Sequence, residues 1–429
     1  MPSTIGLRHA TTAASTSQAF VDEDGRLILP PDVASRLGFV PGTPIQFDEE
    51  GHGLRLRRAV TRVAKVYIEP TNCCNLNCRT CIRNVWDEPL GLMNEAIFNR
   101  LVNDLRALPP PLTVFFGGFG EPLSHPRILE MVRQVKVLGV TVELITNGTL
   151  LDQEMARGLI HAGLDRLWVS LDGATPDSYT DVRLGATLPD VIGNLTTFRD
   201  MRQPIRYPTP EIGIVFVAMQ RNISDLPAVL AIAHDVGASR LMVSNVLPHT
   251  DEMRAETLYN RTLSNDEYYP QPGQPRLILP RIDSNVLGQL PFDVTIRNQW
   301  VIESAGSHAA AGNPGNRCPF IERGATAVGW DGSVSPCLPL LHSHAGYLNG
   351  LERDERRYLV GNLASDNLRG IWEAADYVSF RQRVQDFDFA PCTMCDGCPI
   401  SVTNDKDCYG SDFPSCGGCL WAQGIVQCP

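Results

Sequence analysis

The sequence lacks the features of a membrane-spanning protein and of a protein that binds nucleic acid in bulk. It contains no run of apolar residues that approaches the roughly eighteen to twenty needed to span a bilayer. Lysine and arginine number 37 against 48 aspartates and glutamates, which gives a formal net charge of -11. This acidic balance argues against an anionic membrane surface and against nucleic acid as the main partner.

The first twenty residues lack the apolar segment of a secretion signal. They are rich in serine, threonine and alanine, and we expect them to form a disordered tail. We therefore expect a cytoplasmic protein. The hydrophobic content of 43% is typical of a globular chain with a full core, and 429 residues allow one large domain with satellites or two to three domains.

Cysteine, in contrast, is abundant, with thirteen in the chain. In a reducing cytosol such cysteines are more often metal ligands than disulfides. Cys74, Cys78 and Cys81 stand at C-x3-C-x2-C spacing, just after an apolar run that predicts a strand leading into a loop. Three thiolates can hold three corners of a [4Fe–4S] cluster, whose full set is four. The iron left open makes such a site reactive rather than structural.

Two other interpretations of this loop remain at this point: a zinc site, or buried structural thiols. A zinc site usually takes four ligands, and the nearest later cysteine is Cys318. Buried structural thiols would need no metal. The neighbouring Cys73 is expected to be an ordinary apolar residue, because adjacent cysteines rarely both reach one cluster.

Strand-like and helix-like stretches alternate after residue 64. Apolar runs rich in Val, Ile, Leu and Phe predict strands at 66–68, 112–116, 142–145, 167–171, 212–217 and 241–243. Helices are predicted between them at 94–108, 126–138, 152–162, 188–201 and 224–236. Such strands are typical of a parallel sheet covered on both faces. We expect an α/β fold, a partial, open (β/α)6 barrel with its site at the carboxyl ends of the strands.

Polar residues follow these predicted strands at the ends where a site is expected. They are Gly117, Gly118, Glu121, Asn147, Ser170, Asp172 and, farther along, Arg183. No lysine follows the glycines in P-loop register, and an acid stands where it would repel a phosphate, so the turn suits a cation. Taken alone, Asp172 also fits a turn or a helix N-terminus, and Arg183 also fits the protein surface.

The cysteine spacing and these residues together resemble the radical S-adenosylmethionine (SAM) superfamily. The resemblance implies that the open iron binds the amine and carboxylate of SAM, and that one electron splits SAM into methionine and a 5′-deoxyadenosyl radical. It implies that Glu121 and nearby carbonyls accept hydrogen bonds from the amine. Ser170 and Asp172 would bind the ribose or the carboxylate, and Arg183 would pair with the carboxylate. Contacts to adenine are expected from residues 219–222.

Nine of the cysteines lie at or after residue 318. They are Cys318, Cys337, Cys392, Cys395, Cys398, Cys408, Cys416, Cys419 and Cys428. A Gly-Trp-Asp-Gly run at 329–332 predicts a hairpin turn that returns Cys337 to the side of Cys318. The pattern resembles the SPASM extension of radical SAM enzymes. This implies two auxiliary [4Fe–4S] clusters with eight thiolates, so that one cysteine is spare or an alternative ligand; zinc knuckles are the other interpretation.

The tail also departs from the family pattern, which is C-x2-C-x5-C-x3-C before the last cysteine. The gaps on either side of Cys408 are wider, so cysteines are not assigned to individual clusters. Leu338 follows the G-x4-C cysteine where sulfatase-maturing members carry an aspartate used as a base, which argues against formylglycine formation. His342 and His344 are expected to be structural or exposed.

Residues 21–58 have the pattern of a separate small unit. A strand at 25–30, a short helix at 32–38 and hairpin strands at 44–48 and 54–57 are predicted. The run GRLILPPDVASRLGFVPGTPIQF resembles an AbrB-type swapped-hairpin module, a family that dimerises and often binds DNA. Here seven acidic residues outnumber five arginines, which does not suit a surface that reads phosphates. We predict a protein-contact or homodimerisation module; a plain structural extension is the alternative.

The predicted organisation has five parts. They are a disordered tail (1–20), an AbrB-like β module (21–60), a radical SAM partial barrel (61–250), a linker that covers the barrel (251–315) and a SPASM-like domain (316–429). A further strand is predicted at 276–279 within the linker. The cysteine-rich ending and the head together resemble the maturases associated with tungsten-containing aldehyde oxidoreductases.

These resemblances imply an enzyme with SAM and three [4Fe–4S] clusters, one SAM-binding and two auxiliary. It would abstract hydrogen from a peptide, a protein or a pterin-type cofactor, as a maturase of a tungsten oxidoreductase or of a ribosomal peptide. Ferredoxin or flavodoxin would supply electrons. Two alternatives come from other classes: an iron–sulfur redox sensor whose head reads DNA, and a zinc-stabilised scaffold.

Overall fold

The computed structural model describes residues 19–36, 45–50, 53–58, 62–202, 209–259, 276–279, 301–304, 317–395 and 398–429. The chain divides into two compact units, Met1–Ala59 and Val60–Pro429. The predicted tail, residues 1–20, and the predicted linker, residues 251–315, lie largely outside the described residues. The division into five parts therefore remains a prediction.

The described residues of the N-terminal unit form two antiparallel strand pairs and one helix. Its elements are β1 (Phe20–Val21), β2 (Leu27–Ile28), α1 (Pro31–Arg36), β3 (Ile45–Glu50) and β4 (Gly53–Arg58). The predicted order of elements is present, but the strand expected at 25–30 is shorter. Gly25 has a φ of 78° and belongs to a turn in which Asp22 Oδ1 accepts from the Arg26 N–H, so the strand begins later.

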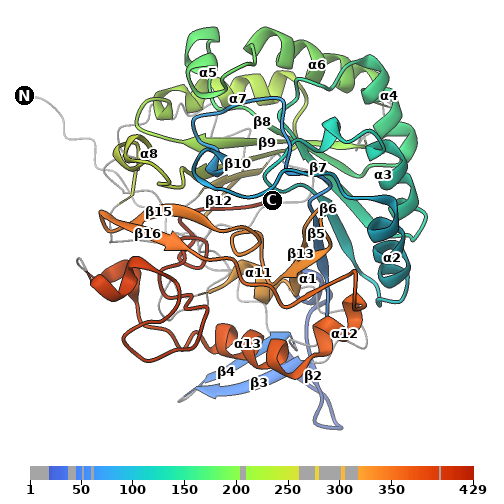
Figure 1. Ribbon diagram of the computed structural model, residues 1–429. Coiled ribbons are helices and arrows are strands. Elements are labelled where there is room, and N and C mark those ends of the chain that lie inside the picture. The colour runs from blue at the N-terminus through green and yellow to red at the C-terminus, as the bar shows by residue number, and fades with distance from the viewer. Residues whose placement is uncertain are drawn as a thin grey trace, which may run out of the picture. The chain divides into compact units, whose positions relative to one another are not determined.

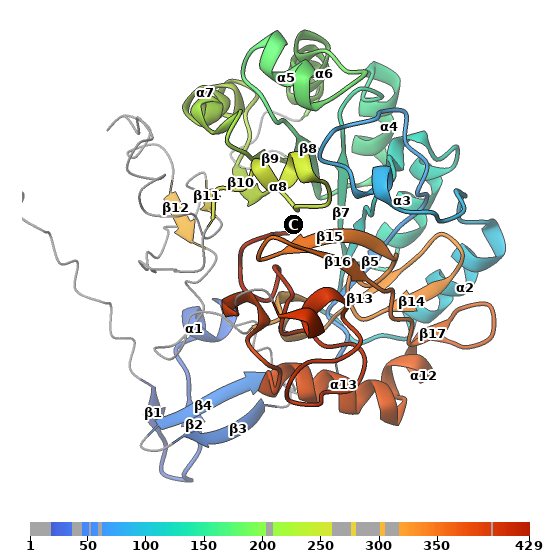
Figure 2. The ribbon, with the colours of Figure 1, turned by 60° about the vertical axis from the view of Figure 1, so that its left-hand side comes forward.

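The second unit is built around a sheet of eleven described strands (Figures 1 and 2), in the order β12-β11-β10-β9-β8-β7-β6-β5-β13-β14-β17. Its centre is the six predicted strands, all parallel to their neighbours. They are β5 (Lys65–Ile68), β6 (Thr113–Phe116), β7 (Thr141–Thr146), β8 (Arg166–Ser170), β9 (Glu211–Ala218) and β10 (Arg240–Asn245). This confirms the α/β fold with a partial barrel.

Helices lie on the outer side of these strands (Figure 1). They are α2 (Glu95–Arg106), α3 (Ile128–Lys136), α4 (Gln153–Ala162), α5 (Pro176–Val182), α6 (Leu188–Met201) and α7 (Leu226–Asp235). Side chains at the N-caps fix where several of them begin: Asn94 and Asp152 each accept from the N–H three residues on. The short helix α5 was not predicted. No helix in the described part of the chain is long and apolar enough to cross a membrane.

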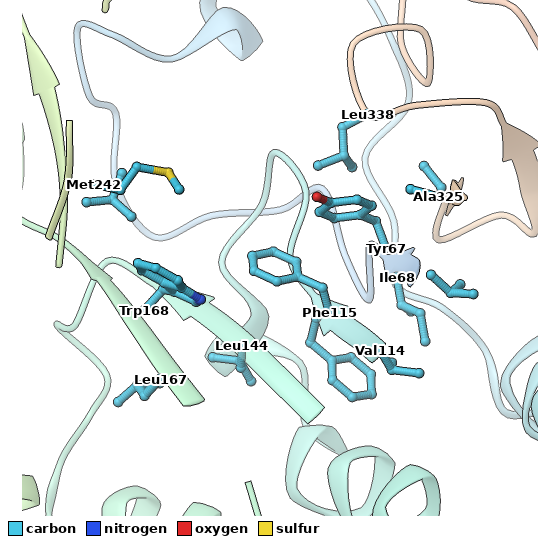
Figure 3. Close-up of a cluster of buried hydrophobic side chains, with 14 of the residues drawn as sticks. Tyr67, Ile68, Val114, Phe115, Leu144, Leu167, Trp168, Met242, Ala325 and Leu338 are labelled. Carbon is cyan, nitrogen blue, oxygen red and sulfur yellow. The ribbon is translucent and has the colours of Figure 1, made fainter. Parts of the chain in front are cut away.

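Strand side chains alternate between the two faces of the sheet, as their period of two requires. Figure 3 shows Tyr67 and Phe115 on one side of β5 and β6, with Ile68 and Val114 on the other. The Tyr67 and Phe115 ring centroids are 5.1 Å apart. All four side chains are buried, and full burial of a large apolar side chain contributes about 1.5–3 kcal/mol. The strand ends that carry the site are therefore fixed by packing on both faces.

Further strands extend the sheet at both edges. β11 (Arg276–Leu279) and β12 (Val301–Ser304) run parallel beyond β10, which confirms the strand predicted at 276–279. β13 (Ala325–Val328) runs parallel to β5, and β14 (Ser333–Ser335) and β17 (Gly361–Asn362) follow antiparallel. The predicted hairpin turn at 329–332 joins β13 to β14 and has Gly332 at a φ of 83°. The C-terminal part is thus continuous with the barrel sheet.

The rest of the C-terminal part consists of short elements. They are a hairpin of β15 (His344–Leu348) and β16 (Leu351–Glu355), and the helices α11 (Pro319–Glu322), α12 (Leu368–Glu373) and α13 (Ala375–Asp386). Helix α8 (Asp251–Ala255) lies outside this part, after β10. Single 3-10 turns are η1 (Ile82–Val85), η2 (Pro122–Ser124), η3 (Ile223–Asp225), η4 (Cys392–Met394) and η5 (Pro399–Val402).

The last residues lie between the two outermost of the six barrel strands. The Gln427 N–H donates to Ser244 Oγ on β10 at 2.9 Å. The Pro429 carbonyl accepts from Lys65 Nζ at 2.8 Å and from the Tyr67 hydroxyl at 2.7 Å, both on β5. Residues 427–429 therefore bridge β10 and β5, where a partial barrel is open.

Candidate active site

Three thiols on the loop after β5 form the first candidate site. A backbone N–H two residues later lies 3.4 Å from Cys74 Sγ, and Arg83 Nε lies 3.3 Å from Cys81 Sγ. Arg183 Nη1 lies 3.9 Å from Cys78 Sγ. Each sulfur thus has an N–H donor beside it, and such donors favour the thiolate, the form that binds metals.

Burial disfavours the thiolate form of two of these thiols when no metal is bound. Burial raises the pKa of Cys74 and of Cys78; Arg183 opposes the effect at Cys78, and the neighbouring thiolates add to it. Binding iron would therefore release protons, as it does at other thiolate sites. Three converging thiols with N–H donors fit a [4Fe–4S] cluster that has one open iron. Cys73 differs, since its Sγ lies near the Gly91 carbonyl at 3.8 Å.

The glycine-rich loop after β6 packs directly on this cysteine loop. The Glu121 N–H donates to the Cys73 carbonyl at 2.8 Å. A Cβ on Gly120 would lie 2.2 Å from the Thr71 carbonyl oxygen and 2.6 Å from that of Cys73. Both atoms belong to backbone that cannot move aside cheaply. The glycine is needed for this close approach of two loops.

We expect Gly120→Ala to reduce loading of the cluster on the cysteine loop, because the new methyl group would push Thr71 and Cys73 out of place. Iron content per chain and the electron paramagnetic resonance (EPR) signal of the reduced cluster would measure the loss. Gly193→Ala is the matched control, since a Cβ there meets nothing within 4 Å. Wild-type cluster content in Gly120→Ala would contradict the packing argument.

Glu121 ties together the ends of β6 and β7. Its Oε1 accepts from Leu123 N at 2.9 Å and Thr146 Oγ1 at 2.7 Å, and its Oε2 accepts from Asn147 N at 2.7 Å. Burial raises its pKa, although these three donors oppose the effect. Three acceptor positions of the carboxylate are thus used within the chain. Asn147 in turn places its Nδ2 3.8 Å from Cys74 Sγ.

Asp172 and Arg183 form a buried ion pair at the end of β8. Asp172 is fully buried, and its Oδ2 lies 2.6 Å from both Nε and Nη2 of Arg183. Its Oδ1 accepts from Val217 N on β9 at 2.7 Å. Burial lowers the pKa of Arg183, but Asp172 outweighs it and holds that pKa above its usual range. Arg183 Nη1 remains directed at Cys78.

The structure therefore brings the predicted SAM-binding residues to one edge of the sheet, the carboxyl ends of β5 to β8. Ser170 is buried at the last position of β8. In the segment 219–222, Asn222 Nδ2 donates to the Asp172 and Val217 carbonyls, which is a structural use of that side chain. The predicted contacts of these residues with SAM remain predictions.

Four cysteines of the C-terminal part line one cavity. They are Cys318, Cys337, Cys416 and Cys419. Burial raises the pKa of Cys318 to about 12 and that of Cys419 to about 11, and it places those of Cys337 and Cys416 well above the usual range. Three buried thiols and the half-buried thiol of Cys419 around one cavity fit the full ligand set of a cubane cluster. The hairpin does return Cys337 to the side of Cys318, as predicted.

A second group of cysteines lies around η4 and η5. Burial raises the pKa of Cys392 to about 11, and the thiolates of Cys395 and Cys408 add to the effect. Asn349 Nδ2 donates to the carbonyls of Cys392 and Cys395 at 2.8 and 2.6 Å, which joins this segment to the turn of the β15–β16 hairpin. Cys398 is half-buried and Cys408 is exposed. This group is less enclosed than the first.

Cys428 belongs to neither group. Its Sγ accepts from Trp421 Nε1 at 3.3 Å, and burial raises its pKa, opposed by the charges of Lys65 and Arg323. Among the described residues, no three His, Cys, Asp or Glu side chains gather tightly enough for a single metal ion. A cubane cluster distributes its thiolates over four irons.

One buried charged group at the same sheet edge was not predicted from the sequence. Glu69 directly follows β5, and its Oε2 lies 2.8 Å from His342 Nε2. His342 Nδ1 also hydrogen-bonds Glu88. Burial lowers the pKa of His342, but the two carboxylates outweigh it and raise that pKa to about 9. His342 and His344 are both buried, so exposure is excluded for both. The position of Glu69 after a strand was the available signal.

Comparison with known families agrees with this geometry. Residues 68–213 match the radical SAM superfamily, and residues 318–399 match the iron–sulfur cluster-binding domain called SPASM. A Pyrococcus furiosus protein described as a tungsten-containing aldehyde ferredoxin oxidoreductase cofactor-modifying protein is 31% identical over 369 residues, which are 85% of this chain and 96% of the relative. An AdoMet-dependent heme synthase of Methanosarcina barkeri is 28% identical over 182 residues, 42% of this chain and 50% of the relative.

Solved structures show the same fold. SuiB of Streptococcus suis, bound to its precursor peptide SuiA, superposes with a TM-score of 0.53 at 13% identity, over 74% of this chain and 66% of SuiB. The protein anSMEcpe, with bound AdoMet and a peptide, superposes with a TM-score of 0.50 at 16% identity, over 85% of this chain and 92% of that chain. At these identities the likeness concerns the fold alone.

Proposed function

Because the chain belongs to the radical SAM superfamily and carries a SPASM domain, we propose that it cleaves SAM reductively and abstracts hydrogen from a substrate with the 5′-deoxyadenosyl radical. The observation that carries the proposal is the convergence of Cys74, Cys78 and Cys81 beside the glycine-rich loop. A [4Fe–4S] cluster held by these thiolates supplies one electron and one open iron when it is bound.

The neighbouring residues shape the pocket in which SAM would bind. Glu121 accepts hydrogen bonds from Leu123 N in η2 and from Asn147 N after β7, and so links these two turns. The backbone carbonyls of 117–120 are thereby held beside the cysteine loop. Arg183 is locked by Asp172, which leaves its Nη1 facing the cluster site. A fixed guanidinium suits a carboxylate such as that of SAM. Preorganised groups of this kind position a substrate at low entropic cost.

For the auxiliary clusters, the two cysteine groups suggest two ligand sets. The first is Cys318, Cys337, Cys416 and Cys419, and the second is Cys392, Cys395, Cys398 and Cys408. Cys428 is then the spare cysteine. These clusters would accept an electron from the substrate radical or supply one, with ferredoxin or flavodoxin as the external donor.

The substrate is proposed to be a pterin-type cofactor or a segment of a peptide or protein. The description of the Pyrococcus relative as a cofactor-modifying protein favours a maturase, since that relative aligns over most of both chains. The N-terminal unit is proposed to make a protein contact, including a homodimer contact.

The direct test uses anaerobically reconstituted, reduced protein with SAM. We expect formation of 5′-deoxyadenosine and methionine, and an iron content per chain that corresponds to three clusters. Intact SAM together with salt-sensitive DNA binding would contradict the proposal and favour a redox-sensing regulator. Colourless protein that contains zinc and no iron would favour a scaffold.

We expect Glu121→Ala to weaken SAM binding by about 1.5–3 kcal/mol, the contribution of a hydrogen bond to a charged group. The change also leaves the Asn147 N–H without its acceptor, so the pocket loosens. Equilibrium dialysis of cluster-loaded protein against labelled SAM measures the affinity. Glu130→Ala is the control, because Glu130 accepts hydrogen bonds from Arg133 and Gln134 on its own helix, α3. Unchanged SAM affinity in Glu121→Ala would remove Glu121 from the site.

A further inference from the structure

The group formed by Glu69, His342 and Glu88 joins three separate segments of the chain. Glu69 directly follows β5, just before the cysteine loop, and Glu88 lies on the segment that follows that loop. His342 comes from the C-terminal part, five residues after the cysteine Cys337 that lines the auxiliary cavity. The group therefore connects the SAM side of the protein to the auxiliary side.

All four carboxylate oxygens and both imidazole nitrogens of this group have hydrogen-bond partners within the chain. Glu69 Oε1 accepts from Phe119 N at 3.0 Å, and Glu88 Oε1 accepts from Ser343 N at 2.8 Å. The remaining oxygen of each carboxylate binds one nitrogen of His342. Glu69 is fully buried and His342 is 5% exposed. A satisfied buried network of this kind fixes geometry rather than exchanging protons with a substrate.

Phe119 and Gly118 belong to the glycine-rich loop, so the network reaches the pocket through Glu69. A Cβ on Gly118 would lie 2.6 Å from Glu69 Oε1, which shows how closely the loop rests on that carboxylate. The centroid of the His342 ring lies 5.6 Å from that of Phe119 and 4.5 Å from that of Trp86. Aromatic and polar contacts thus hold the loop and the histidine together.

We propose that His342 is a positioning residue that holds the 117–121 loop through Glu69. It thereby couples SAM binding to the position of the auxiliary-cluster loop, the segment 337–342 that leads from Cys337 to His342. The inference rests on the proposed function, because it assumes that this loop forms part of the SAM pocket. Without the imidazolium, Glu69 would be a buried carboxylate with no cationic partner. Its position would no longer be fixed by an ion pair, and its hold on the Phe119 N–H would weaken. By linkage, SAM should also stabilise the auxiliary-cluster loop.

His342→Gln in the cluster-loaded, full-length protein tests the proposal. We expect SAM affinity to fall about tenfold, with iron content unchanged and with the rate of SAM cleavage at saturating SAM within about twofold of wild type. His125→Gln is the matched control, because His125 is equally buried and its two ring nitrogens hydrogen-bond to backbone groups, the Met93 carbonyl and the Arg127 N–H. A merely structural role would lower iron content and rate together instead of raising the SAM dissociation constant alone.

A double-mutant cycle with Glu88→Gln sharpens the test. If the charge of His342 is what holds the group, removing Glu88 should matter much less once His342 is neutral, so the two effects on SAM affinity should not add. Additive effects would overturn the coupling.

The pH dependence of stability gives a readout independent of activity. His342 faces Glu69, Glu88 and His344; Arg357 faces Glu88, and burial lowers the pKa of His344. The pKa of His342 is raised to about 9, so its stabilisation is fully present below about 6.5 and is lost as pH rises through 9. The melting-temperature difference between wild type and His342→Gln should therefore shrink between pH 7 and 10.

The outcomes separate this inference from the proposed function. If wild type forms no 5′-deoxyadenosine, the proposed function fails. If wild type is active while His342→Gln matches it in SAM affinity and in melting temperature from pH 7 to 10, the proposed function stands and the positioning role of His342 is overturned.

Discussion

Cys78→Ala is expected to abolish formation of 5′-deoxyadenosine and to remove about four iron atoms per chain, the content of one cubane. Cys78 is one of three thiols on the cysteine loop. A cluster held by only the two remaining thiolates would be exposed to solvent and would dissociate. The auxiliary cysteines lie in separate groups of the C-terminal part, so their iron should remain. Iron analysis, EPR of the reduced protein and product assays under anaerobic conditions measure the three quantities.

Two matched variants make this result interpretable. Cys73→Ala alters the adjacent residue, whose Sγ lies near the Gly91 carbonyl, and should keep both iron and activity. Cys416→Ala removes a thiol from the auxiliary cavity and should lose auxiliary iron while SAM cleavage without substrate persists. Loss of all iron in Cys78→Ala would contradict separate sites, and wild-type activity would show that Cys78 is not a ligand.

The barrel strands could be predicted closely because their signal is local. Each apolar run is buried on both faces, and its ends are set by the polar residues that follow, so β5 to β10 begin and end near their predicted bounds. Helix α5 was not predicted because its first turn, capped by Thr175, directly follows the turn at Asp172. In the sequence the two cannot be told apart. Helix α13 carries several charged residues on a short segment and gives little periodic signal.

The positions of the candidate residues at the strand ends were predictable from the sequence, but their contacts were not. The strand ends could be placed from sequence, since parallel strands bring their carboxyl ends to one edge. The partners could not, because they come from distant segments: Glu121 binds the turn after β7, and Asp172 binds Arg183 and β9. His342 and Glu69 are 273 residues apart, so nothing local connects them. Only the folded chain shows that these carboxylates are largely occupied by its own donors.

Asp172→Ala is expected to lower the free energy of unfolding by about 3–5 kcal/mol, the usual cost of leaving one member of a buried ion pair without its partner. Asp172 is fully buried and the Arg183 side chain is 11% exposed, so solvent does little to replace the lost carboxylate. The change also leaves the Val217 N–H on β9 without an acceptor. Urea unfolding under anaerobic conditions measures the loss.

A second substitution separates the folding role of this pair from a role toward SAM. Replacing a buried pair by apolar side chains is often neutral, so Asp172→Ala with Arg183→Met should recover much of the lost stability. SAM affinity should not recover, because the guanidinium beside Cys78 is then absent. A loss below about 1 kcal/mol for Asp172→Ala, typical of exposed pairs such as Arg369–Glu373, would mean that the pair is not buried in solution. Full recovery of SAM affinity in the double variant would instead remove Arg183 from the SAM site.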